Sequence, residues 1–164
     1  MKTVYRIIGL FLLLPLLSGC NDSDDVAAIF TGKTWKLNMI SKDGEGKMYD
    51  FWGGNEEKKE ESIQKLQRGG TFTVKFEGTV EGDLIQGQVS GTTVTQPMSG
   101  QWSANGKTHE FKSGVTGKDE SDPLARSFLE GLNSATSYDG DSQNLYLIYE
   151  KQGVKYRMFF RVAK

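Results

Sequence analysis

The chain has 164 residues, with 20 Lys and Arg against 21 Asp and Glu, and a single cysteine. A net charge near zero without a basic cluster argues against nucleic acid as a partner, because proteins that bind nucleic acid concentrate positive charge. One cysteine excludes an internal disulfide and a metal site built from several cysteines, so the fold depends on packing.

The N-terminus has the pattern of a bacterial lipoprotein signal. Lys2 and Arg6 precede an almost purely apolar run over 7–17, which is shorter than the roughly 20 residues that a membrane-spanning helix needs. The segment 17–20, Leu-Ser-Gly-Cys, resembles the bacterial lipobox. That resemblance implies that residues 1–19 are a signal peptide and that Cys20 is acylated. A plain secretory signal with a chance cysteine is the alternative.

The segment after this signal is predicted to be a tether. Residues 20–31 read as an acylated cysteine followed by an acidic linker, and 21–25 resemble the acidic export signals of Bacteroidota surface lipoproteins. Removal of residues 1–19 from the 164-residue chain leaves 145, enough for one domain over 32–164. We therefore expect a protein that is lipid-anchored in the cell outer membrane, on its periplasmic or its surface face.

Alternating hydrophobicity predicts an all-β domain. In 34–40, Trp35, Leu37 and Met39 share one face, and 71–77 repeats the pattern with three large apolar residues. We predict an antiparallel barrel or a strongly twisted sheet of about eight strands with two short helices.

Two hairpins stand out. Asn105-Gly106 is the strongest two-residue turn signal, and that register would pair Trp102 with His109 on the apolar face. A second two-residue turn at Gln152-Gly153 would pair Glu150 with Lys155. The inner face of this second hairpin would then carry Leu145, Leu147, Tyr149, Tyr156, Met158 and Phe160.

Two helices interrupt the strands. Asn55 is a plausible N-cap for a surface helix over 56–68, whose acidic first turn suits the helix dipole. Asp122 caps the second helix and Pro123 occupies its first position. Apolar residues then recur every four positions, so this helix should lie on the sheet or plug one end of a barrel.

Several short segments follow one another in a distinctive order: 32–37, 89–91, 99–103, 105–107, 128–132, Tyr138 and 145–147. This order resembles the META domain of bacterial envelope lipoproteins. The Gly-x-x-Trp start at 32–35 is also similar to lipocalin-like barrels. Both resemblances imply an antiparallel β domain with no settled enzymatic role. The sequence departs from the META pattern at 91–95, which reads Gly-Thr-Thr-Val-Thr where the family has Gly-Cys-Asn.

Five residues are candidates for contact with a ligand or partner. Trp35, Trp102 and His109 could line a lumen, although a lone histidine is more commonly a hydrogen-bonded core residue. Tyr49 and Trp52 belong to an aromatic run that could form an exposed platform or part of the core. No catalytic set and no metal site is predicted, and we expect no cofactor.

Three functions remain open at this stage. The preferred hypothesis is a non-enzymatic binding, inhibitory or stress-related module of the cell envelope, whose partner could be an envelope protein, a glycan or a small ligand. The second is a lipocalin-like carrier of a small hydrophobic ligand. The third, an enzyme, is disfavoured because the sequence contains no nucleophile–base pair that points to one.

Overall fold

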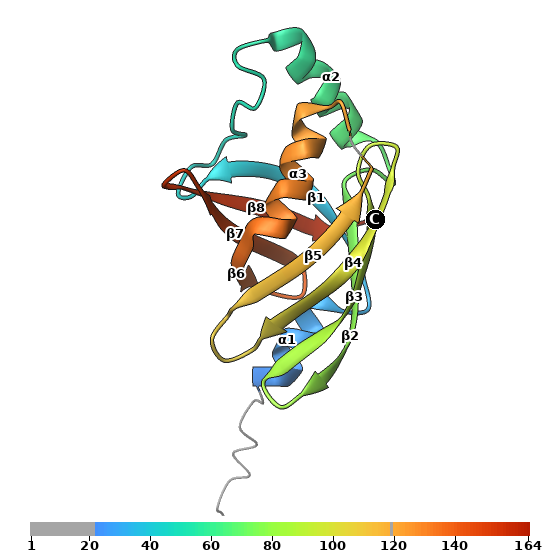
Figure 1. Cartoon of the computed structure of the whole chain (residues 1–164), viewed down its shortest axis with the longest axis vertical. Helices are drawn as coiled ribbons and strands as arrows, with labels where there is room; N and C mark the ends of the chain where they lie inside the picture. The colour runs from blue at the N-terminus through green and yellow to red at the C-terminus, as the bar shows by residue number, and fades with distance from the viewer. Residues whose placement is uncertain (1–21, 119) are drawn as a thin grey trace, which may run out of the picture.

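The computed structural model describes residues 22–118 and 120–164, in which three helices and eight strands are formed (Figure 1). The helices are α1 (Asp22–Phe30), α2 (Glu56–Gln67) and α3 (Pro123–Ser134). The strands are β1 (Thr34–Lys42), β2 (Thr73–Glu81), β3 (Leu84–Thr92), β4 (Pro97–Asn105), β5 (Phe111–Gly117), β6 (Ala135–Gly140), β7 (Asn144–Lys151) and β8 (Val154–Val162).

The strands form one antiparallel sheet in the order β5-β4-β3-β2-β1-β8-β7-β6. The sheet curls until its two edge strands, β5 and β6, approach each other, and an isolated bridge joins Glu110 to Ser137. The sheet is not closed, and we call this architecture the open barrel. The all-β prediction with about eight antiparallel strands is confirmed.

Glycines allow the tight curl of the sheet. A Cβ added to Gly87 in β3 would lie 2.1 Å from the carbonyl oxygen of Glu77, and one added to Gly91 would lie 2.0 Å from that of Thr73. Both oxygens belong to β2, so this strand and β3 approach more closely than a side chain would permit.

Helix α3 occupies the gap in the wall that the sheet leaves. It packs against β5 and β7 and continues directly into β6 at Ala135. Leu124, Phe128 and Leu132 recur once per turn and are fully buried, which confirms the predicted apolar stripe. The predicted Asp122 cap is also confirmed: its Oδ1 accepts the Leu124 and Ala125 N–H groups over 2.9 and 3.1 Å.

Helix α2 lies at one end of the open barrel and forms as predicted (Figure 1). The Asn55 Oδ1 accepts the Lys58 N–H over 3.0 Å, so the N-cap is the expected one. Of the two apolar residues of this helix, Leu66 is buried and Ile63 is half-buried, which fits a surface helix.

The prediction of a linker over 20–31 is wrong for residues 22–30, because these form α1 at the opposite end of the open barrel (Figure 1). Val26 and Phe30 are one turn apart and therefore share a face, and both are buried. The Phe30 ring meets four other rings, with centroids 4.8 to 5.7 Å away, in Phe76, Trp102, Phe111 and Tyr138. The domain therefore begins before residue 32.

The two hairpins turned out differently. The β7–β8 hairpin has the predicted register, with Glu150 opposite Lys155 and the predicted inner face buried. The predicted register of the β4–β5 hairpin is wrong, because Trp102 pairs with Ser113 rather than with His109. The Asn105 Oδ1 accepts the Lys107 and Thr108 N–H groups, each over 2.9 Å, and so builds a longer loop than a two-residue turn.

Strand β1 contains an irregularity that the alternating pattern did not predict. Trp35 and Leu37 are buried as expected, but the register against β8 shifts between Leu37 and Met39. This β-bulge turns Met39 away from the core, and Ile40 is buried instead.

The predicted signal peptide and Cys20 lie outside the described residues. Within residues 22–118 and 120–164, every helix is too short or too polar to cross a bilayer.

Candidate functional site

Trp35 and Trp102 are core residues in this structure. Both rings are buried, and both indole N–H groups are satisfied by backbone carbonyls: Trp35 donates to Phe30 over 3.3 Å and Trp102 donates to Glu77 over 3.1 Å. The Phe30 ring packs on Trp102 with its centroid 4.8 Å away, and the Phe30 carbonyl is the acceptor for Trp35. These two tryptophans therefore face a packed interior.

Trp52 and Tyr49 cover the α2 end of the open barrel. Trp52 is buried and donates from Nε1 to the Ser62 Oγ over 2.8 Å. Tyr49 is half-buried, and its ring packs edge-on against Phe51 and Tyr156 with centroids 4.9 and 5.2 Å away. Of this pair, Tyr49 alone keeps a substantial surface toward solvent.

His109 lies exposed on the β4–β5 loop, and its predicted position beside Trp102 is wrong. Its ring stacks on Tyr138 at 5.1 Å and 21°. The backbone is in the left-handed region with a φ of 58°, and the His109 carbonyl accepts the Tyr138 N–H over 3.0 Å. His109 therefore marks the point at which the β4–β5 loop meets β6.

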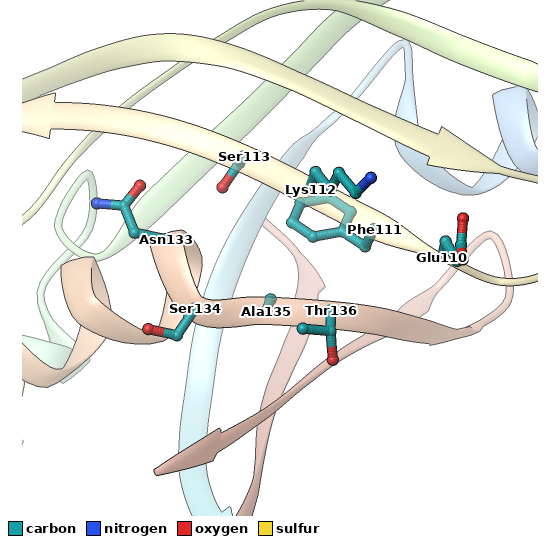
Figure 2. A pocket seen from close by; sticks show the side chains of 8 residues that line it. All are labelled: Glu110, Phe111, Lys112, Ser113, Asn133, Ser134, Ala135 and Thr136. Atoms are coloured by element: carbon teal, nitrogen blue, oxygen red, sulfur yellow. The ribbon is translucent and has the colours of Figure 1, made fainter.

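That meeting point is the narrow end of a groove between β5 and β6, which we call the seam groove (Figure 2). Beyond the Glu110–Ser137 bridge, β5 pairs only with β4 and β6 only with β7 among the described residues. The facing edges of the two strands are therefore not joined by a continuous ladder.

The C-terminal end of α3 closes the wide end of the seam groove. The Asn133 side chain imitates a strand partner, because its Nδ2 donates to the Val115 carbonyl over 2.9 Å and its Oδ1 accepts the Val115 N–H over 2.6 Å. Ser113 donates from Oγ to the Leu132 carbonyl over 2.8 Å. The two ends are thus held by side-chain and backbone hydrogen bonds on rigid elements.

Between these ends the seam groove has a volume of about 350 Å³. Phe111 and Ala135 are buried at its base, whereas the side chains of Glu110, Lys112 and Thr136 are exposed. Figure 2 shows residues 110–113 along one side and 133–136 along the other. A ligand in this groove would meet an apolar base and a rim with one acid, one ammonium and hydroxyl groups.

A second hollow of about 230 Å³ continues from Lys112 and Ser113 across the outer face of β4 to β3. Its polar lining comes from Gln86 and Gln101, which are exposed, and from Ser103, which is half-buried. The two hollows together make a surface of mixed polarity that crosses β3 to β6.

Lys36, Tyr149 and Tyr156 are among the groups outside the seam groove whose pKa values are shifted. Burial lowers the pKa of Lys36 to about 8. Its Nζ donates to the Arg68 carbonyl and to the Thr71 Oγ1, each over 2.9 Å. Burial, reinforced by the Glu130 carboxylate, raises the pKa of Tyr149, and burial raises the pKa of Tyr156. Tyr149 and Tyr156 are buried in the body of the domain, whereas Lys36 is half-buried.

A buried polar cluster joins α2 to α3. The Ser62 Oγ donates to the Asp122 Oδ2 over 2.9 Å and accepts from Trp52, while the Lys65 Nζ lies 3.1 Å from the same Oδ2. The Ser62 hydroxyl donates its hydrogen bond to the Asp122 carboxylate, which also caps α3. The cluster therefore holds the two helices together and does not activate a nucleophile. Within the described part of the chain, no three His, Cys, Asp or Glu side chains are grouped to hold a metal ion.

Sequence reasoning missed the seam groove because its two sides lie 20 or more residues apart and carry no motif. The apolar stripe of α3 was the one sequence signal that pointed to the position of this groove. A helix that replaces part of a wall must leave a boundary with the neighbouring strand, and the C-terminal end of α3 lies on that boundary.

A family model described as a domain of unknown function, DUF4847, matches residues 21–162. The crystal structure of a DUF4847 family protein from Bacteroides vulgatus ATCC 8482 is similar to this chain, with a TM-score of 0.61 and 23% sequence identity. The match covers 83% of this chain and 96% of that chain, and at this identity it shows a shared fold. No curated protein matches the chain.

Proposed function

This chain belongs to the DUF4847 family, and from that premise we propose that it is a lipid-anchored, non-enzymatic binding module of the cell envelope. It binds a short extended peptide segment of a partner protein in the seam groove. The anchor is Cys20, and the support for it is the lipobox-like segment 17–20. The META and lipocalin-like resemblances remain predictions on which the proposal does not depend.

The observation that carries the proposal is the interrupted pairing between β5 and β6. An extended peptide can add to an exposed strand edge, where main-chain hydrogen bonds supply affinity and neighbouring side chains supply specificity. At the seam groove, Glu110, Lys112 and Thr136 are positioned to supply that specificity. A peptide carrying both charges would suit this rim.

The packed interior favours this binding module over the hydrophobic-ligand carrier. A carrier needs an enclosed apolar cavity of several hundred Å³. Here the Phe30 ring occupies the space among Trp102, Phe111 and Tyr138. The surface grooves, rather than the interior, are therefore the sites that we propose for binding.

The test places a photo-crosslinking amino acid at Thr136 in the full lipoprotein in intact cells. The control position is Glu57, which is exposed on α2 and far from the seam groove (Figure 1). We expect one protein adduct from position 136 and none from position 57. A crosslinker placed at Lys112 should give an adduct with the same protein. The substitution Thr136→Trp should abolish this adduct from position 112.

Three results would overturn the proposal. An adduct from position 57 alone would move the binding surface to α2, and a carbohydrate adduct would identify a glycan ligand. No adduct from either position, together with a small molecule bound to the purified domain, would favour the carrier. Mass spectrometry of the native N-terminus tests the anchor separately, with Cys20→Ala as the unacylated control.

A further inference from the structure

We propose that the α1 end of the open barrel rests on the headgroup layer of the bilayer, while α2 points away from it. This inference rests on the proposed acylation of Cys20. It adds an interaction surface and a fixed orientation, which a lipid anchor alone does not supply. The two ends in question are the lower and the upper end of the molecule in Figure 1.

The first step is that α1 is held rigidly in the domain. Val26 and Phe30 are 1% and 0% exposed, which is as buried as any residue of the sheet. Past its C-terminal end, the Lys33 Nζ donates to the Ala28 carbonyl over 2.6 Å and to the Ser142 carbonyl over 2.9 Å. Lys33 thus ties α1 to the β6–β7 loop, and α1 cannot swing freely about the start of β1.

The second step is the length of chain between the lipid and α1. In the sequence, one residue, Asn21, separates Cys20 from Asp22, the first residue of α1. Two Cα–Cα steps of about 3.8 Å place the Cys20 Cα within about 8 Å of the start of α1. A tether this short holds the α1 end at the membrane surface, whereas a flexible linker of ten or more residues would let the domain tumble.

The third step is the chemistry of the surface that meets the membrane. The α1 end also carries the β2–β3 turn and the β4–β5 loop, which the Gly106 N–H joins to the Asp83 carbonyl over 2.8 Å. Asp83, Lys107 and the β6–β7 loop residues 141–143 are exposed and polar. Such a surface suits the hydrated headgroup layer and not the hydrocarbon core.

This orientation leaves the seam groove open to the side. The groove lies in the wall of the open barrel between β5 and β6, and it runs from Glu110, at the end of the β4–β5 loop, to Asn133 at the end of α3. A partner could therefore reach it without displacing the anchor.

The experiment uses the acylated full-length lipoprotein in liposomes that contain a headgroup-linked fluorescence quencher. Acylation consumes the single native thiol, so a new cysteine is the one site for a fluorophore. We expect severalfold stronger quenching for Lys107→Cys, in the β4–β5 loop, than for Glu60→Cys on α2, since both positions are exposed but lie at opposite ends.

A matched variant inserts about 20 Gly and Ser residues between Asn21 and Asp22, a linker whose ends lie about 25 Å apart on average. It should weaken quenching at Lys107→Cys and remove most of the difference between the two labels. Equal quenching with the native tether, or stronger quenching at Glu60→Cys, would overturn the orientation. An unacylated N-terminus in mass spectrometry would overturn the anchor itself, so the two failures are distinguishable.

Discussion

The open barrel is closed by a helix at each end, and the two ends are held by different chemistry. At the α1 end, Phe30 packs among four aromatic rings in a fully apolar contact. At the α2 end, Trp52, Ser62, Lys65 and Asp122 form a hydrogen-bonded chain that links α2 to α3. The apolar end gains stability from burial, whereas the polar end depends on every partner being present.

The two ends should therefore respond differently to substitution. An apolar contact weakens in proportion to the atoms that are removed, so the cost of substitution at position 30 should grow as the residue becomes smaller and be large for alanine. Loss of one partner in the polar cluster leaves the other buried groups unsatisfied.

Phe30→Ala should lower the free energy of unfolding by about 3–5 kcal/mol, because it leaves a cavity among four rings. Urea denaturation of the mature chain in the Cys20→Ala background measures this. Ile63→Ala on α2, where the side chain is half-buried, should cost about 1 kcal/mol or less. Equal effects of the two substitutions would mean that α1 does not close its end as described.

Asp122→Ala should cost about 2–3 kcal/mol, because it removes the α3 N-cap and leaves Ser62 and Lys65 without their shared acceptor. Asp122→Asn keeps an oxygen for the cap and should cost less than the alanine variant in the same denaturation assay. A cost below about 0.5 kcal/mol for Asp122→Ala would show that the polar end is not held by this cluster.

Glu120→Gln should cost about 1 kcal/mol near neutral pH, because the Glu120 carboxylate accepts the Val94 and Thr95 N–H groups over 3.2 and 3.1 Å. Burial opposes ionisation, but these hydrogen bonds and that of Thr93 lower the pKa of Glu120 below its ordinary 4.5.

The pH dependence of this effect follows from the sign of the shift. A carboxyl with a depressed folded-state pKa stabilises the fold above its ordinary pKa, and this stabilisation is lost as the pH falls through the folded-state value. The stability gap between the wild type and Glu120→Gln should therefore shrink below pH 4.5. A gap that grows on acidification would contradict the assignment.

Lys36 should produce a small rise in stability between pH 8 and 10.5, because the side chain is only half-buried and solvent screens its charge. Burial lowers the pKa of Lys36 from 10.5 to about 8, so within this window the unfolded chain holds a proton that the folded chain has released. NMR titration of the Lys36 side-chain amine should give a midpoint near pH 8. Lys36→Met should remove the rise in stability, and a rise that persists in this variant would assign it to another group.

Local signals predicted the features whose partners lie nearby in the chain. Asn55 and Asp122 cap α2 and α3 as expected, and the β7–β8 hairpin keeps the predicted register. The same kind of signal failed at Asn105-Gly106, because the Asn105 side chain bonds the loop backbone and lengthens the turn. The acidic composition at the start of 22–30 favoured the prediction of a linker. This segment instead forms a helix whose apolar pair, Val26 and Phe30, is buried.

By itself, the sequence determined the strand class, the two capped helices and the expectation of a lipid anchor, because alternation, capping and turn chemistry act over a few residues. Only the tertiary structure decided the docking of α1, the replacement of a wall strand by α3, and the seam groove that results. These features join residues far apart in the chain, such as Asn133 with Val115. The geometry of these features depends on how the sheet curls and on where strand pairing stops. No local sequence pattern encodes either property.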